Sequence, residues 1–171
     1  MDDKKQRYHT LVEENIGIIR KLSRGYTNGQ EDFEDTVQEV CLQLWRSFGS
    51  FRGESKASTW VYRVTLNVCL TQLKRRKRIE LVPTEVPQLN DAVEARGDHG
   101  QQDPQVELLY RAINTLPPID RAVIMLYLDK LEHAEIADIV GLGVSNVGVK
   151  INRIKKKLKK MIHDRAGRDL G

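Results

Sequence analysis

Residues 133–160 read HAEIADIVGLGVSNVGVKINRIKKKLKK, and this stretch decides how the C-terminal part of the chain folds. Apolar residues recur at helical spacing on both sides of Gly141, which predicts a short helix followed by a longer one. The GLG sequence at residues 141–143 gives the backbone freedom for a tight turn. Either Gly143 or Ser145 can begin the second helix, and Ser145 is the better cap. Two helices joined by a short glycine-containing turn predict a helix-turn-helix.

The second of these helices carries a dense cluster of cations with no acid among them. The cluster consists of Lys150, Arg153, Lys155, Lys156, Lys157, Lys159 and Lys160. A solvated helix face is the structural alternative, because lysine-rich faces are common on all-α proteins. The density of the cluster favours nucleic-acid binding, with early residues of the helix at base edges and later cations at phosphates.

Charge is distributed in separate blocks along the chain, which has 171 residues and a formal net charge of +4. Residues 31–39 contain five acids and no base, whereas residues 74–78 are five consecutive bases. The basic blocks indicate a polyanionic partner, and the acidic block indicates a different, basic partner. We expect a cytoplasmic protein, because no apolar run is long enough to span a membrane and the N-terminus lacks a signal-peptide core.

Motifs for catalysis or for metal binding do not stand out in the sequence. Cys41 and Cys69 lie in helical patterns without paired spacing, and the four histidines are scattered. Glu135 lies near His133, but the second histidine of a zinc-binding helix is missing. We therefore expect a binding protein with no enzymatic activity, no cofactor, no metal and no small-molecule substrate.

Helical spacing of apolar residues also extends over most of the remaining chain, and no strand pattern appears. The predicted helices cover residues 7–26, 31–48, 60–76 and 106–116, and one more starts at Pro117-Pro118. Ser58 or Thr59 is expected to cap the third helix. Residues 81–104 are acidic and rich in proline and glycine, which predicts a flexible linker. The expected fold is all-α, with helical domains at residues 1–80 and 105–171.

Two N-terminal helices have patterns that suggest binding surfaces. The helix over residues 31–48 places acids opposite its apolar stripe, although acids near a helix start also counter the helix dipole. The helix over residues 60–76 begins with Trp60, Tyr62 and Arg63 and ends in the basic block. Rings beside cations are typical of a single-strand site, but a tryptophan at this spacing is more often a core residue.

Taken together, these motifs resemble the sigma factors of bacterial RNA polymerase, in the extracytoplasmic-function group of the sigma-70 family. Residues 35–45, DTVQEVCLQLW, resemble the helix that docks on the β′ clamp of core polymerase. Residues 51–78 resemble the segment that melts and reads the −10 promoter element, and residues 116–158 resemble the domain that reads the −35 element. The resemblance implies an alternative sigma factor that binds core polymerase, through the β′ clamp and the β flap, together with promoter DNA.

The resemblance also assigns roles to individual residues. Core-polymerase binding falls on Asp35, Gln38, Glu39 and Leu42. Binding of the −10 element falls on Lys56, Ser58, Thr59, Trp60, Arg63, Asn67, Lys74 and Arg75, with residues 56–59 forming a pocket for a flipped base. Binding of the −35 element falls on Ser145, Asn146, Gly148, Val149, Lys150 and Arg153. The family commonly has a cation where Gly148 stands, so its usual −35 sequence is not expected to transfer directly.

A free-standing helix-turn-helix regulator is the alternative function. The acidic helix over residues 31–48 and the aromatic and basic segment over residues 60–78 distinguish the two, because a free regulator needs neither. An anti-sigma factor is a common partner in the family, but no feature of this sequence indicates whether the chain binds one.

Overall fold

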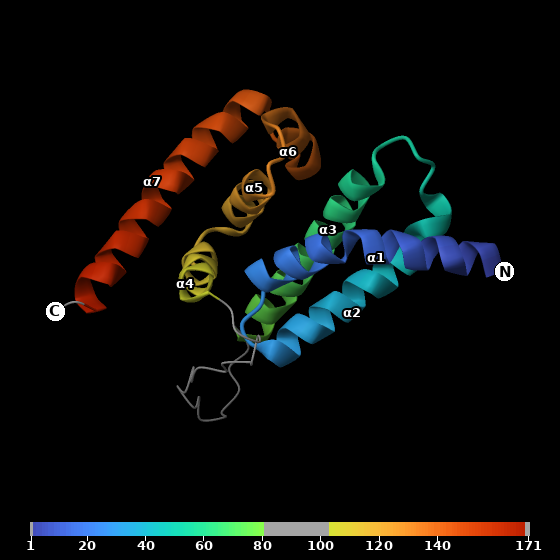
Figure 1. Cartoon of the computed structure of the whole chain (residues 1–171), viewed down its shortest axis with the longest axis horizontal. Helices are drawn as coiled ribbons and strands as arrows, with labels where there is room; N and C mark the ends of the chain where they lie inside the picture. Colours follow the sequence, from blue (N-terminus) through green and yellow to red (C-terminus); the bar gives the residue numbers. More distant parts are fainter. Residues whose placement is uncertain (1, 81–102, 170–171) are drawn as a thin grey trace. The chain divides into compact units, whose positions relative to one another are not determined.

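The structure, a computed structural model, describes residues 2–80 and 103–169, and these residues form α-helices with no strand (Figure 1). They belong to two units, one within residues 1–99 and one within residues 100–171. The predicted all-α fold with two helical parts is confirmed.

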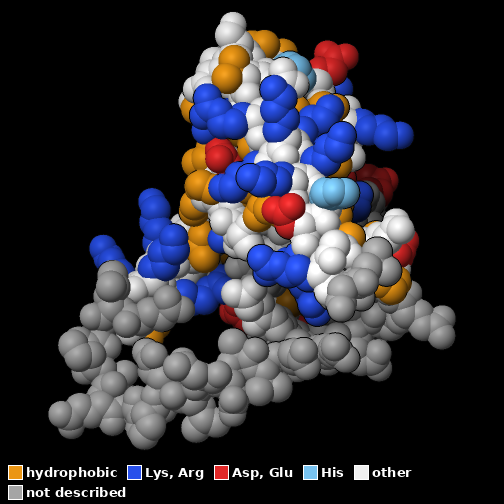
Figure 2. All heavy atoms as spheres, turned by 90° about the vertical axis from the view of Figure 1, so that its left-hand side faces the viewer, with side chains coloured by type: hydrophobic (Ala, Val, Ile, Leu, Met, Phe, Trp, Pro, Cys, Tyr) orange, Lys and Arg blue, Asp and Glu red, His pale blue; other side chains and the backbone are white. Residues whose placement is uncertain are grey.

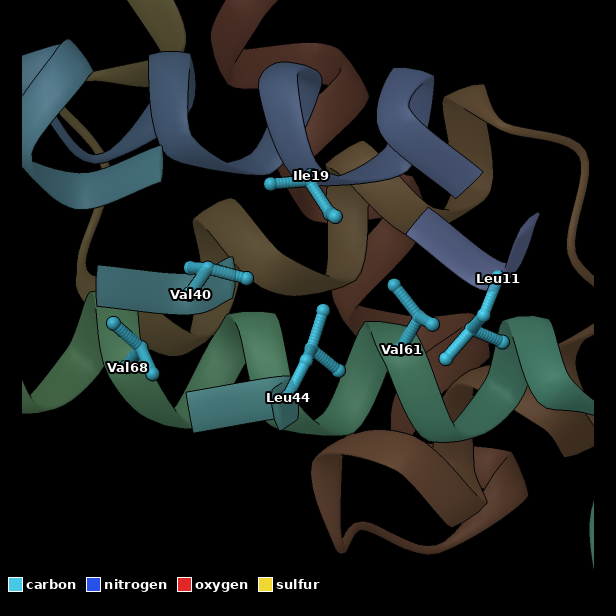
Figure 3. Packing of buried hydrophobic residues seen from close by; sticks show 6 residues of the cluster. All are labelled: Leu11, Ile19, Val40, Leu44, Val61 and Val68. Atoms are coloured by element: carbon cyan, nitrogen blue, oxygen red, sulfur yellow. The ribbon is translucent and has the colours of Figure 1, made fainter. Parts of the chain in front are cut away.

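The N-terminal unit is built from three long helices. They are α1 (Asp2–Gly25), α2 (Gln30–Ser47) and α3 (Ala57–Glu80), with a single 3-10 turn, η1 (Phe48–Ser50), after α2. Each helix contributes apolar side chains that point toward one another in Figure 3: Leu11, Ile19, Val40, Leu44, Val61 and Val68. Burial of a side chain of this size contributes roughly 1.5–3 kcal/mol, so this cluster stabilises the packing of the three helices.

Polar contacts fix how α2 and α3 align. The Thr36 hydroxyl donates to the Gln72 side-chain oxygen at 2.6 Å, and one turn away Arg76 forms an ion pair with Asp32. Because residues 32 and 36 meet residues 76 and 72 in reverse order, the two helices run antiparallel. The acidic and basic blocks, expected to serve separate partners, therefore neutralise each other in part within this unit.

Helix α3 starts earlier and ends later than the sequence predicted. The N–H of Trp60 donates to the Lys56 carbonyl at 3.2 Å, so Lys56 is the N-cap. The prediction that Ser58 or Thr59 caps this helix was wrong, because both lie in its first turn. The chain bends before this helix, at Gly53, whose φ of 72° is a conformation that glycine adopts without steric cost.

The C-terminal unit consists of α4 (Pro104–Ile113), α5 (Pro118–Leu128), α6 (His133–Val140) and α7 (Val144–Asp169). At the start of α4, the Asp103 side chain accepts from the N–H of Gln105 at 2.9 Å, and Pro104 takes the first helical position. The predicted linker therefore ends before Pro104. Its other residues, 81–102, lie outside the described part of the chain.

The turn between α6 and α7 uses glycine as predicted, but its cap differs. Gly141 has a φ of 74°, and its N–H donates to the Ala137 carbonyl at 2.9 Å. The Val147 N–H donates to the Gly143 carbonyl at 3.0 Å, so Gly143, not Ser145, is the N-cap of α7. Glycine is nearly as favourable as threonine at an N-cap, so the tight turn, not a hydroxyl, decides where the helix starts.

The predicted apolar stripe of α7 is confirmed. Its members are Val147, Ile151, Ile154 and Leu158, and each is at most 6% exposed. They recur at spacings of four, three and four residues, which keeps them on one side of the helix. This burial leaves the opposite side of α7 to solvent.

Candidate functional site

Helix α2 presents three of the predicted polymerase-binding residues along one ridge. Asp35, Gln38 and Leu42 are all exposed, and their spacings of three and four residues place them on the side opposite buried Val40 and Leu44. Leu42 is 41% exposed, so the ridge combines an acid, an amide and an apolar side chain. Glu39 is only half-buried and lies on the flank of this ridge.

A partly exposed aromatic residue extends this surface. Trp45 belongs to the apolar stripe of α2 by spacing, yet it is 38% exposed. The Tyr8 ring packs edge-on against it with 5.0 Å between centroids, and the Lys4 ammonium lies 5.0 Å from the ring centroid. The Tyr8 hydroxyl in turn donates to the Cys41 carbonyl at 2.6 Å, which holds the ring in place. The Trp45 ring is thus partly exposed but fixed in position, at the end of the α2 ridge.

One side of α3 gathers several of the residues predicted to bind the −10 element. Lys56, Arg63, Asn67 and Lys74 are separated by seven, four and seven residues, so they lie along a single line of the helix. Lys56, Asn67 and Lys74 are exposed and Arg63 is half-buried. Three cations with one amide among them suit a nucleic-acid backbone that runs along the helix.

The structure does not bring the residues of the predicted base pocket to one side of α3. Ser58 lies three and four residues before buried Val61 and Tyr62, so helical register turns it toward the core, away from Lys56. The Trp60 ring packs against the unit's core and stacks on Phe51 with 4.8 Å between centroids. Thr59 is half-buried beside them.

The basic block at the end of α3 is divided between solvent and the protein itself. Lys74 and Arg75 are exposed, and Lys74 continues the line of Asn67. Arg76 faces α2 and is paired with Asp32. The expectation that this basic block meets a polyanionic partner therefore does not extend to Arg76, whose guanidinium already has a carboxylate partner.

Helix α7 presents an outward face, made of Ser145, Asn146, Val149, Asn152 and Arg153, and all five are exposed. Figure 2 shows lysine and arginine side chains spread over this side of the C-terminal unit. Four of the five residues were predicted from sequence. Asn152 was not predicted from sequence. Its position three residues after Val149 would have placed it on the same face by helical register alone.

Two residues predicted to bind the −35 element lie on the flanks of α7 instead. A Cβ placed on Gly148 would lie 3.6 Å from Nδ1 of His133, at the start of α6. The Lys150 ammonium donates to an Asp120 carboxylate oxygen of α5 at 2.9 Å, and these side chains are only 26% and 23% exposed. Gly148 thus faces α6, and Lys150 is engaged within the unit.

A groove of about 470 Å³ runs between α4, α5 and α7. Its apolar lining includes Leu109, Ile124, Tyr127, Leu128 and Leu158. Lys155, Lys156 and Lys159 of α7 stand along it, and the Lys155 ammonium lies 5.3 Å from the Tyr127 ring centroid. An apolar groove with a cationic rim suits an amphipathic segment that carries acids.

Neither thiol has the surroundings of a reactive or metal-binding cysteine. Cys69 is fully buried, and this burial raises the pKa of its thiol to about 12. Burial also raises the pKa of Cys41. Over residues 2–80 and 103–169, no group of three or more His, Cys, Asp or Glu side chains gathers where it could hold a metal ion. Within the same residues, no helix is long and apolar enough to cross a membrane.

Two family models match the sequence, one in each unit. Sigma-70 region 2 matches residues 11–79, and Sigma-70 region 4 matches residues 106–158. The first range contains the ridge of α2 and the polar line of α3. The second contains the helix-turn-helix and the outward face of α7.

Curated relatives carry the same description. The chain is 30% identical over 142 residues to the ECF RNA polymerase sigma factor SigW of Bacillus subtilis, covering 77% of this chain and 75% of that protein. It is 28% identical over 165 residues to SigE of Mycolicibacterium smegmatis, of whose length it covers 59%.

Solved structures support the fold. The sigma factor RpoE from Bartonella quintana, in complex with the anti-sigma factor NepR, matches with a TM-score of 0.68 and 20% identity, covering 95% of this chain and 98% of that one. CnrH, in complex with the cytosolic domain of CnrY, matches with a TM-score of 0.65 and 21% identity, covering 94% and 90%.

Proposed function

Because the chain belongs to the extracytoplasmic-function group of the sigma-70 family, we propose that it is an alternative sigma factor. In this function it binds core RNA polymerase, recognises the −35 and −10 elements of promoters and separates the two DNA strands for initiation. It performs no catalytic step of its own and acts in the cytoplasm, where the polymerase is. The observation that carries the proposal is the order of the two matched regions along one chain.

The ridge of α2 is the proposed contact with the β′ clamp. Asp35 and Gln38 offer polar groups to a basic partner, and the exposed Leu42 side chain supplies an apolar contact between them and Trp45. Glu39 adds a second carboxylate from the flank. Interfaces of this kind place an apolar centre inside a polar rim, and the charges direct the approach of the partner.

The line of α3 is the proposed path of the −10 strand. Lys56, Arg63 and Lys74 would hold phosphates, and Asn67 among them offers an amide that can donate and accept toward a base edge. Trp60, stacked on Phe51, would support the start of this path. Ser58, Thr59 and Arg75 are assigned to the −10 contact by resemblance only.

The outward face of α7 is the proposed reader of the −35 duplex. Its early residues would meet base edges in the major groove, and Lys156 and Lys160 further along the helix would meet phosphates. Gly148 would not meet the duplex, because it faces α6, and Lys150 would act indirectly, through its ion pair with Asp120.

The groove between α4, α5 and α7 is the proposed site for the β flap of the polymerase or for a segment of an anti-sigma factor. One similar solved structure holds the sigma factor RpoE in complex with the anti-sigma factor NepR, and another holds CnrH in complex with the cytosolic domain of CnrY. We also propose domains at residues 1–80 and 105–171 and a linker at residues 81–104, of which Pro104 already belongs to α4.

Run-off transcription with purified core polymerase tests the proposed function. Adding the chain should allow the core enzyme to start at specific sites on a genomic template, whereas a free-standing regulator would bind DNA but not support initiation by core enzyme alone. A chain that binds duplex operators tightly without polymerase, and never supports initiation, would exclude the sigma-factor function.

A double charge reversal tests the α2 contact. Asp35→Lys with Glu39→Lys should weaken binding to core polymerase roughly tenfold or more, because the reversal sets two lysines against the basic groups of the partner. Glu13→Lys with Glu14→Lys is the matched control, since it makes the same charge change at exposed positions of α1. Equal competition for core polymerase by both double variants would show that the ridge is not the contact.

A further inference from the structure

Val149 is a large apolar side chain on an otherwise polar surface. It is 55% exposed, the highest exposed fraction among the large hydrophobic residues described in the C-terminal unit. At about 100° per residue it lies roughly 170° from the middle of the buried stripe of α7. Single exposed apolar residues are common on proteins, so the meaning of Val149 depends on its surroundings.

Small and polar residues surround Val149 on the helix. Ser145 lies one turn before Val149, and its small side chain does not block a close approach to a surface. Asn146 and Arg153 are exposed on the same side and can hydrogen-bond to base edges. Val149 itself can offer only an apolar contact, in the second turn of the helix whose early residues would enter the groove.

The DNA major groove contains a single apolar group that such a side chain can recognise. The 5-methyl group of thymine projects into the groove beside hydrogen-bonding groups, and small apolar side chains distinguish thymine through it. The Val149 methyl groups, at the centre of a polar face, are complementary to that group in size and polarity.

We propose that Val149 reads the 5-methyl group of a thymine and thereby makes thymine the preferred base at one position of the −35 element. This role rests on the proposed function, in which α7 lies in the major groove. It adds the base and the chemical group that the contact selects.

Deoxyuridine substitution provides the test, because uracil differs from thymine only by the missing methyl group. The chain is assembled with core polymerase, and the resulting holoenzyme is used to select DNA duplexes from a random library. The enriched −35 duplex is then resynthesised with each thymine replaced singly by uracil. Replacement of the thymine that Val149 contacts should weaken holoenzyme binding roughly fourfold, the equivalent of one buried methylene group.

Two valine variants connect the methyl group to Val149. Val149→Ala should bind the thymine duplex as weakly as the parent binds the uracil duplex, and it should lose no further affinity on uracil. This change does not endanger folding, because alanine favours helix more than valine. Val144→Ala is the matched control: Val144 is 51% exposed but lies about 140° around the helix from Val149, and this variant should keep the full uracil penalty.

The outcomes separate this role from the proposed function. A uracil penalty of equal size in Val149→Ala, or one that disappears in Val144→Ala instead, would overturn the assignment to Val149. An enriched element in which no thymine methyl affects binding would overturn methyl recognition while leaving −35 reading intact. Failure of the holoenzyme to enrich any −35 sequence would overturn the proposed −35 function, and the role of Val149 with it.

Discussion

Replacement of Gly148 by alanine should stabilise the C-terminal unit without altering DNA binding. Gly148 lies inside α7, where glycine weakens a helix because it loses more backbone entropy than any other residue. The added methyl group would stand 3.6 Å from Nδ1 and 3.7 Å from Cε1 of His133, which is ordinary van der Waals contact. Nothing in the surroundings therefore opposes the gain in helix propensity.

The size of the effect follows from that geometry. Gly→Ala in a helix interior gains about 0.5–1 kcal/mol, and the contact with His133 neither adds strain nor removes an interaction. For a unit of this size such a gain corresponds to a rise in midpoint temperature of about 2–8 °C. Because Gly148 lies on the flank of α7, affinity of the holoenzyme for a −35 duplex should stay the same.

Gly141→Ala is the matched control, with the same chemical change and the opposite expected sign. An added Cβ at Gly141 would meet nothing within 4 Å, so only the backbone decides the outcome. Its φ of 74° is left-handed, which costs a residue with a side chain about 1–2 kcal/mol. The two variants should therefore shift the midpoint in opposite directions.

Thermal unfolding followed by far-ultraviolet circular dichroism measures both variants. Tryptophan emission reports the N-terminal unit separately, because Trp45 and Trp60 both belong to it. A loss of stability in Gly148→Ala would mean that α6 and α7 pack more closely at His133 than the structure shows. A loss of −35 affinity in a stable Gly148→Ala variant would mean that this side of α7 meets DNA.

Three further perturbations follow from contacts between helices. Asp32→Asn should destabilise the N-terminal unit by about 1 kcal/mol, measured by urea denaturation, because it leaves the partly buried Arg76 guanidinium without its carboxylate. Asp120→Asn should release Lys150 to a phosphate and steepen the dependence of promoter affinity on salt by about one counterion, an effect that should vanish in a Lys150→Gln background. The Cys69 thiol has a pKa of about 12 in the folded state and of about 9 in the unfolded chain. Because only the unfolded thiol loses its proton between these pH values, the free energy of unfolding should fall there by about 1.4 kcal/mol per pH unit for this group. Urea midpoints of a Cys69→Ala variant should show a shallower alkaline decline than those of the parent.

Local periodicity was sufficient to predict the helices and the side that each one buries. The α7 stripe and the Gly141 turn follow from spacing and from the conformational freedom of glycine, so they could be read without any tertiary information. Helical register also predicts which residues share a face, as with Asp35, Gln38 and Leu42 on α2. The outward face of α7 is another such case, and Asn152 belonged to it by the same reasoning.

The sequence by itself thus determined the helical class, the helix-turn-helix and most of the exposed faces that the proposed function uses. Only the tertiary structure decided which charges on those faces are already engaged. Arg76 and Asp32 are 44 residues apart, and Lys150 and Asp120 are 30 apart, so each pair forms only when two helices pack in a particular register. The same packing turns Gly148 toward His133 and leaves Trp45 partly exposed. Register between helices depends on the complementary shapes of two buried surfaces, and the periodicity of either helix alone does not contain that information.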